Sequence, residues 1–371
     1  MIANIKKYFP ILLLVFISGC VNLPGFGTDV INANPTSSEE GFRDVLVIKD
    51  ISTIPRSPVL PEQDILFSFV IENRDKDKKA ENVIVDLFDA PLFKSPTEKD
   101  DKGNLILCND GTKPCKPDRC GVASPCTILP GDQKQINFAL KAPSKSELAN
   151  LRSDIELSFS VRYAFTGSTL FKTVVVNLDE IKARQRAGNP ISLDIPEFFG
   201  SGPMKIDAKL EGAPYILSPY GASITFTIKS LGDPSIGSLL NSKIPKTEVD
   251  ANGKVTKEVF KIIFPKELMN LHTKTASITE TDIKDKLDFP AEYFTCTEDS
   301  ISIRCLNNYK VDATGKYEEI SLFKGESTPL FFRIKETPAI REPFRSFDIK
   351  AELNYTYELR SSARITVMPI G

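Results

Sequence analysis

The sequence predicts an all-β protein that contains two β-sandwich domains. Hydrophobic and polar residues alternate along several short segments, which is typical of strands with one buried face. The segments of the first half recur in the same order in the second half. A chain of 371 residues is long enough for two or three domains. The alternation and the repeat together favour a duplicated β domain.

The strand prediction for the first half rests on three alternating segments. The first, 64–72, carries hydrophobic side chains at every second position, namely Ile65, Phe67, Phe69 and Ile71. The second, 83–87, follows the charged turn RDKDKKAEN. The third, 155–163, leads into a further hydrophobic run at 170–176. Each segment is expected to bury one face in the core of a sandwich.

The second half repeats these segments in order. The shorter matches pair 64–72 with 222–230, 83–88 with 259–264, and 131–141 with 325–335. The longest match aligns DIELSFSVRYAF with SFDIKAELNYTY without a gap, at 154–165 and 346–357. Both stretches end in an aromatic-x-aromatic pair, Tyr163/Phe165 and Tyr355/Tyr357. Chance similarity between amphipathic strands is the alternative, but four matches in one order favour duplication.

The β pattern breaks between residues 179 and 203, where Gly and Pro are frequent. We therefore place the first sandwich domain at 42–180, a linker at 181–202 and the second sandwich domain at 203–371. Within the break, residues 180–187 fit one or two helical turns.

Three segments of the first half carry a family resemblance. They read FVIEN (69–73), NVIVDLFD (82–89) and LPGDQKQINFAL (129–140). This order of strands resembles the immunoglobulin-like domains of microbial cell-surface adhesion proteins. The resemblance implies two tandem immunoglobulin-like sandwiches used for adhesion, spacing or assembly. The tryptophan of antibody domains has no counterpart, because the chain contains none.

The first twenty residues have the layout of a secretory signal. Two lysines precede an apolar run at 11–17, which is far shorter than the ~20 residues needed to cross a bilayer. The final four residues, ISGC, resemble the lipobox of lipoprotein signal peptides, although its first position more often holds Leu. The resemblance implies a lipid on Cys20 and cleavage just before it, which makes 1–19 the signal peptide. The alternative is an ordinary secretory signal that ends in cysteine.

Residues 20–41 are rich in Gly, Pro, Ser and Asn and lack a periodic apolar pattern, so we expect a flexible tether. An exported chain with two acyl chains on Cys20 would be stably anchored to the outer face of a cell membrane, at the cell surface or in the periplasm.

Six further cysteines favour disulfides, because their number is even and an exported chain meets oxidising conditions. They form a cluster of four and a separate pair, namely Cys108, Cys115, Cys120 and Cys126, and Cys296 and Cys305. The cluster allows three pairings, and the sequence does not choose among them. Zinc is the alternative for the cluster, but its spacing matches the tight knuckles of structural zinc sites poorly.

The composition argues against several classes of chemistry. A formal net charge of −2 without a dense basic stretch argues against nucleic-acid binding. The single histidine, His272, lacks the surroundings of a catalytic triad, so we expect no catalytic residue, no cofactor and no bound metal. Two acidic turns that could hold calcium, at 75–77 and 98–101, are interleaved with lysines. Two similar stretches at 249–254 and 311–316 place a glycine as hairpin turns require, which we prefer to a metal loop. Asn354 begins a glycosylation sequon, but inside a predicted strand.

The sequence therefore favours a non-enzymatic surface lipoprotein that binds an envelope protein or a surface polymer. An architectural spacer or subunit of a cell-envelope complex is the alternative. A hydrolase that uses carboxylates alone is a third hypothesis, and it requires two acids facing one cleft.

Overall fold

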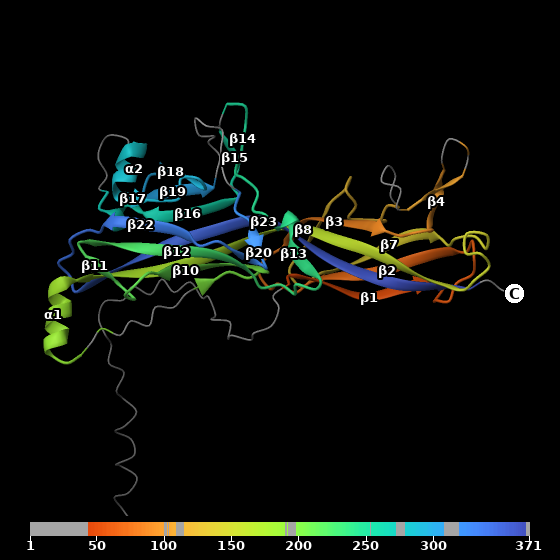
Figure 1. Ribbon diagram of the computed structural model, residues 1–371, viewed down its shortest axis with the longest axis horizontal. Helices are drawn as coiled ribbons and strands as arrows, with labels where there is room; N and C mark the ends of the chain where they lie inside the picture. The colour runs from red at the N-terminus through yellow and green to blue at the C-terminus, as the bar shows by residue number, and fades with distance from the viewer. Residues whose placement is uncertain are drawn as a thin grey trace, which may run out of the picture. The chain divides into compact units, whose positions relative to one another are not determined.

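The computed structural model describes residues 44–368, apart from 100–101, 103, 109–114, 190, 192–197, 253, 272–278 and 308–318. The predicted signal peptide, the tether, Cys20, His272 and the turn at 311–316 lie outside the described residues. Residues 40–371 form one compact unit. Its described part is dominated by strands and antiparallel sheets (Figure 1), which confirms the prediction of an all-β protein.

The first outer sheet belongs to the first half of the chain and has the strand order β1-β2-β7-β4-β5. Its strands are β1 (Leu46–Ile54), β2 (Asp64–Asn73), β4 (Lys94–Lys99), β5 (Leu105–Leu107) and β7 (Gln133–Lys141). The strand predicted at 64–72 is β2, which pairs with β7 along nine residues from Asp64 to Glu72.

The second outer sheet has the order β17-β22-β12-β21-β20, with β10 also paired to β12. Its strands are β10 (Met204–Leu210), β12 (Tyr220–Ser230), β17 (Leu287–Asp288), β20 (Leu322–Phe323), β21 (Glu326–Ser327) and β22 (Leu330–Glu336). The run β10-β12-β22 repeats the order β1-β2-β7 of the first outer sheet.

The central sheet joins both halves in the order β18-β19-β16-β23-β8-β3-β6, with β9, β11 and β13 paired along its two longest strands. Its main strands are β3 (Ala80–Asp89), β6 (Cys126–Ile128), β8 (Ser153–Asn177), β16 (Phe260–Pro265), β18 (Phe294–Glu298), β19 (Ser302–Asn307) and β23 (Phe344–Val367). The short ones are β9 (Phe198–Phe199), β11 (Ile216–Ser218) and β13 (Gly237–Leu239).

The remaining described elements are short. A hairpin is formed by β14 (Glu248–Val249) and β15 (Val255–Lys257). The helical segments are α1 (Leu178–Arg186), α2 (Glu280–Lys286), and the 3-10 turns η1 (Leu240–Ser242) and η2 (Lys266–Met269). The helical turns predicted at 180–187 correspond to α1, which begins where the Asn177 side chain accepts a hydrogen bond from the N–H of Asp179. Among the described helices, none combines the length and apolarity needed to cross a bilayer.

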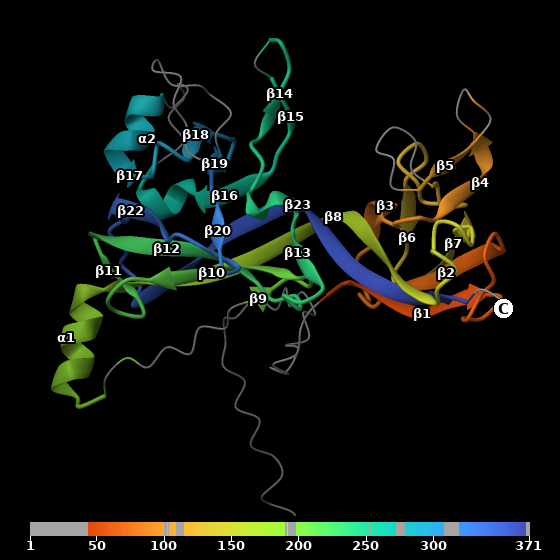
Figure 2. The ribbon, with the colours of Figure 1, turned by 45° about the vertical axis from the view of Figure 1, so that its right-hand side comes forward.

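The strands β8 and β23 run through the whole central sheet, as Figures 1 and 2 show. All 24 residues of β23 pair with β8 in one unbroken antiparallel ladder. The first part of β8 pairs with β3 on its other side, whereas its second part pairs with β9 and β11. The C-terminal part of β8 therefore lies among strands of the second half of the chain. In the same way, the C-terminal part of β23 lies beside the strands of the first half. The division into domains at 42–180 and 203–371 stays a prediction.

This ladder has an approximate two-fold symmetry that follows from the repeat. The gapless alignment relates the two halves by 192 residues (346 minus 154), so that Ala164 corresponds to Thr356. Ala164 and Thr356 are also direct partners in the ladder. The neighbours pair reciprocally, because Tyr163 faces Tyr357 and Phe165 faces Tyr355. The same segment of each repeat thus binds its counterpart, as in an isologous dimer interface.

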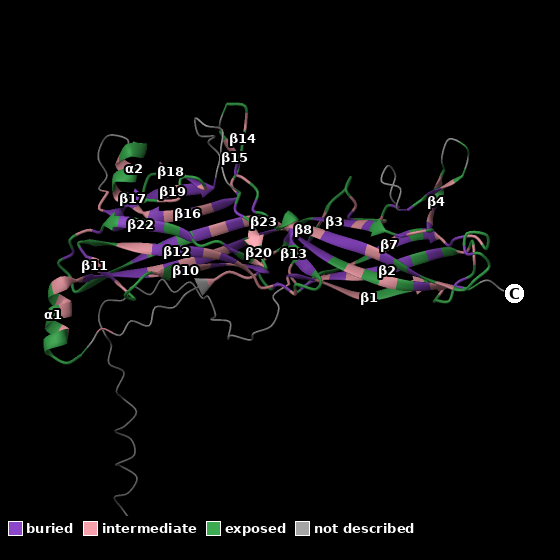
Figure 3. Ribbon diagram, in the orientation of Figure 1, coloured by how far each residue is buried: buried purple, intermediate pink, exposed green. Residues whose placement is uncertain are grey.

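Buried residues recur along the strands of all three sheets (Figure 3), and most of the largest fully buried side chains are phenylalanines. On the first outer sheet, Phe69 stacks on Phe159 of the central sheet with ring centroids 4.3 Å apart. On the second, Phe332 contacts three rings whose centroids lie 5.2–5.5 Å away, those of Phe226, Phe264 and Phe294. These aromatic residues, which are among the largest fully buried side chains, contribute apolar area that drives the layers together.

Candidate binding pocket at the junction of the two halves

A pocket of about 850 Å³ opens over the centre of the β8–β23 ladder. Its floor lies on the pair Ala164 and Thr356, at the two-fold position. One wall comes from the first half, at 77–84 with Leu129 and Pro130, and the other from the second half, at Leu240, Pro245, Lys257 and Val259. The pocket therefore exists only because the two repeats pair through their long strands.

The first wall is shaped by Asn73, the last residue of the FVIEN segment. This side chain is fully buried, and its amide nitrogen donates to the carbonyls of Lys78 and Ile128 at 3.0 and 3.1 Å. Its oxygen accepts from the N–H of Asp75, whose own carboxylate accepts from the N–H groups of Asp77 and Lys78 at 2.8 Å. These consecutive Asx turns bend the chain 74–79 over the pocket.

A bulge in β3 continues this wall. The register with β8 shifts between Glu81 and Ile84, and Asn82 there has a left-handed backbone with φ of 49°. A bulge adds one residue to a strand and redirects its side chains. Here the bulge interrupts the regular pairing of β3 with β8 at the edge of the pocket. At this edge, Glu81 forms an ion pair with Lys79 at 2.6 Å.

Lys78 is the half-buried cation of this wall. Its Nζ donates to the carbonyl of Thr166 at 2.9 Å and lies 5.6 Å from the centroid of the Phe165 ring. No carboxylate in the described part of the chain lies within 4 Å of this ammonium. Burial lowers the pKa of Lys78, although Asp75, Glu352 and Asp77 act in the opposite direction. The ammonium thus has unused donor capacity in a partly desolvated place.

Arg162 adds a second incompletely bonded cation. It lies on β8 opposite Glu358 and lines the floor. Its ion pair with Asp86 is long, at 3.6 Å, and its Nε is buried without a hydrogen-bond partner among the described residues. An orphaned buried donor costs free energy, about 1–3 kcal/mol in typical proteins.

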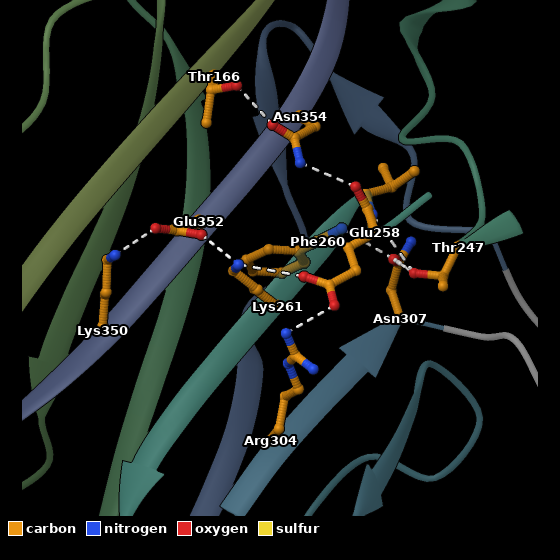
Figure 4. Close-up of polar contacts among 11 residues, drawn as sticks. Thr166, Thr247, Glu258, Phe260, Lys261, Arg304, Asn307, Lys350, Glu352 and Asn354 are labelled. Atoms are coloured by element: carbon orange, nitrogen blue, oxygen red, sulfur yellow. Dashed lines mark hydrogen bonds and ion pairs between the residues drawn. The ribbon is translucent and has the colours of Figure 1, made fainter. Parts of the chain in front are cut away.

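The second wall is held by the buried side chain of Asn307, which binds backbone groups of this wall as Asn73 does in the first wall (Figure 4). Its oxygen accepts from the N–H of Phe260 and from the Thr247 hydroxyl, both at 2.9 Å. Its nitrogen donates to the carbonyl of Pro245 at 2.8 Å. Asn307 therefore fixes the chain on both sides of the β14–β15 hairpin, including the pocket residue Pro245.

Asn354 links this wall to the floor. Its nitrogen donates to the carbonyl of Glu258 at 2.8 Å, and its oxygen accepts from the Thr166 hydroxyl at 2.5 Å (Figure 4). Both polar atoms of the predicted sequon asparagine are thus engaged in the junction. The sequon itself lies in the interior of β23.

Beside the pocket, charged side chains connect β16, β19 and β23. Lys261 binds Glu258 at 3.1 Å and Glu352 at 2.5 Å, while Arg304 binds Glu258 at 2.7 Å (Figure 4). Lys350 also binds Glu352. Burial alone would raise the pKa of Glu352, but the hydrogen bonds from Lys261 and Lys350 outweigh it and lower that pKa. The network secures the second wall to the ladder.

The two repeated aromatic pairs form a cluster at the floor, and two of its rings, Phe165 and Tyr355, line the pocket. Tyr163 and Tyr357 contact each other with centroids 5.9 Å apart, and Phe165 contacts Tyr355 at 6.2 Å. Burial raises the pKa of Tyr163 and Tyr355 well above the ordinary value. The three tyrosine hydroxyls have no hydrogen-bond partner of normal geometry in the described part of the protein. The cluster packs the two halves against each other at the junction.

The six predicted disulfide cysteines pair as neighbours in the sequence, and none of them lines the pocket. The bridges join Cys108 to Cys115, Cys120 to Cys126, and Cys296 to Cys305. The structure thus selects one of the three pairings open to the cluster. The second bridge lies against β3, because the N–H of Val85 donates to the carbonyl of Cys120 at 2.8 Å. Three disulfides indicate an oxidising, extracytoplasmic environment.

The other predicted features are not assembled into one site. Within the described residues, no group of three or more His, Cys, Asp or Glu side chains could hold a metal ion. The acidic turn at 249–254 is a hairpin turn in which Asp250 accepts hydrogen bonds from the N–H groups of Asn252 and Lys254, both at 2.9 Å. In the turn at 75–77, Asp75 is used for the Asx turn of the first wall.

Sequence reasoning missed the pocket residues Lys78 and Arg162. Lys78 stands in a charged turn, and Arg162 is one of many polar residues that alternate along a strand. The asparagine that ends FVIEN was a usable signal, because an asparagine after an apolar strand favours an Asx turn.

No protein-family model matches this sequence, and neither does any curated protein.

Proposed function

We propose that this chain is an exported lipoprotein, held at the outer face of a membrane by a lipid on Cys20. Its tandem immunoglobulin-like sandwiches bind an envelope protein or a surface polymer. The junction pocket is the observation that carries the binding role, because both halves contribute to its walls and its floor.

Two further observations support the proposal. Three disulfides fit a chain that has passed through an export signal. The packing of an outer sheet on one end of the central sheet, with β1-β2-β7 repeated as β10-β12-β22, fits a pair of related sandwiches.

An architectural spacer is the second candidate, and the β8–β23 ladder favours it. A ladder of 24 residue pairs leaves little freedom for the two halves to move against each other. Such a body suits a subunit that holds two other components at a fixed separation. A spacer does not require the junction pocket, and this difference separates the two candidates.

The test combines membrane fractionation with crosslinking on intact cells. Wild type is expected in the membrane fraction, whereas Cys20→Ser is expected to leave it. Crosslinks to a specific envelope component should vanish in Leu240→Glu, which places a charge in the pocket wall. They should persist in Leu151→Glu, because Leu151 is exposed and lies outside the pocket.

Each result has a separate meaning. If Cys20→Ser stays with the membrane like the wild type, the lipid anchor is wrong. If crosslinks are equally strong in Leu240→Glu, the pocket has no part in binding and the spacer role is favoured.

A further inference from the structure

The junction pocket combines positive charge with an aliphatic surface. The charged side chains that line it carry an excess of two positive charges. The cations are Lys78, Lys79, Arg162 and Lys257, and the acids are Asp77 and Glu81. Glu81 is already paired with Lys79. Both acids are exposed at the rim, whereas Lys78 and Arg162 lie deeper. The two inner charged side chains of the lining are therefore both cations, and Asp86, which does not line the pocket, pairs with one of them.

The two inner cations have bonding capacity to spare. The Lys78 ammonium carries three donors, and one of them is used by the carbonyl of Thr166. The Nε of Arg162 has no acceptor among the described residues, and its ion pair with Asp86 is long. An acidic group bound in the pocket would therefore meet unused donors on two lining side chains, Lys78 and Arg162.

The rest of the lining is mostly aliphatic. It comes from strands and turns of both halves, namely Ile84, Leu129, Pro130, Leu240, Pro245 and Val259. Leu129 is half exposed, at 52%. Covering this surface by an apolar body would remove it from water and stabilise the complex. A pocket of about 850 Å³ is in the usual range for enclosing a small organic ligand.

From these features we propose that the junction pocket binds a small amphiphilic anion, with one acidic group on an aliphatic body. The acidic group lies between Lys78 and Arg162, and the aliphatic body lies along Leu129, Leu240 and Pro245. This inference rests on the pocket that carries the proposed binding role and names the chemical class of its ligand, but it does not depend on the lipid anchor.

Since the chain has no tryptophan, a single introduced tryptophan gives a local fluorescent signal. The chain carries Cys20→Ser throughout, so that its own lipid cannot compete for the pocket. The reporter is Leu129→Trp in the pocket, and its matched control is Leu151→Trp, an exposed position elsewhere. The probes are decanoate, decyl phosphate, decanol, decyltrimethylammonium and acetate, all below their micellar concentrations.

Decanoate is expected to shift the emission of Leu129→Trp in a saturable manner and to leave that of Leu151→Trp unchanged. Decanol should bind more weakly because it lacks the charge, and acetate because it lacks the aliphatic body. Decyltrimethylammonium should not bind. Comparing decanoate with decyl phosphate identifies which acidic group the two cations prefer.

Added substitutions then separate charge from the apolar wall. Lys78→Met in the reporter chain should weaken decanoate binding about tenfold or more, since a charge-assisted hydrogen bond is lost. It should change decanol binding little. Leu240→Glu should abolish binding of both probes. Lys209→Met, at an exposed lysine of β10 outside the pocket, is the matched control and should have no effect.

Two results would overturn the proposal. One is the absence of any saturable decanoate or decyl phosphate response in Leu129→Trp, with the fold intact by circular dichroism. The other is a response that is equal in Leu151→Trp or insensitive to both Lys78→Met and Leu240→Glu, because either would mean non-specific adsorption. Neither result bears on whether Cys20 anchors the chain or whether a protein partner is crosslinked.

Discussion

At the residue scale, two buried asparagines determine the walls of the pocket. In Asn73 and Asn307, the side-chain oxygen and nitrogen both form hydrogen bonds with backbone groups that no neighbouring strand binds. Backbone polar groups that leave a sheet and stay buried need such partners. The polar side chains in the core are therefore what allows the chain to turn at the junction.

We expect Asn73→Ala to lower the free energy of unfolding by about 2–4 kcal/mol, because three buried hydrogen bonds are lost and their backbone partners stay buried. Urea denaturation followed by circular dichroism measures this change. Asn252→Ala, at an exposed turn residue, is the matched control and should be neutral. A loss below about 0.5 kcal/mol for Asn73→Ala would show that water replaces these bonds.

At the scale of elements, alternation gives each strand its buried face but not its partner. Residues 154–165 and 346–357 correspond without a gap, and the same alternate positions are buried in both. Two of the shorter matches align their buried positions only after a shift by one residue, namely 64–72 with 222–230 and 83–88 with 259–264. In the first of them, the buried residues of β12 are Ile224, Phe226 and Ile228. A one-residue shift exchanges the faces of a strand, so burial corrects the alignment.

The ion-pair network across β16 and β23 predicts a pH dependence. The folded-state pKa of Glu352 is lower than its ordinary value of 4.5, so its contribution to stability is present above pH 4.5. That contribution is lost as the pH falls through the folded-state pKa, because the unfolded chain then binds the proton more readily. Wild type should therefore lose more stability between neutral and acidic pH than Glu352→Gln. Parallel pH profiles for the two chains would contradict this prediction, which urea titrations at each pH can measure.

At the scale of the whole molecule, the two halves complete each other through β8 and β23. The second part of β8 pairs with β9 and β11 of the second half, and the last part of β23 pairs with the first part of β8 and, at Val367, with Val59 of the first half. Separated from its partner, each half would expose one long unpaired strand edge, which favours association or aggregation.

We therefore expect residues 44–189 and 198–371, expressed separately, to form homodimers or aggregates rather than stable monomers. A protease site inserted after Gly188 gives the matched test in the intact chain, since the nicked protein should stay associated in gel filtration. Two halves that are each monomeric and cooperatively folded would instead support independent domains at 42–180 and 203–371.

The sequence by itself predicted the main alternating strands, the repeat, the break near residue 180 and disulfides among six cysteines. These follow from local periodicity and residue chemistry, which a single chain displays directly. Only the tertiary structure decided that the repeats pair with each other through Ala164 and Thr356, which cysteines join, and that Lys78 and Arg162 share a pocket. The physical reason is that alternation specifies which face is buried, whereas the partner of a strand depends on contacts between residues far apart in the chain.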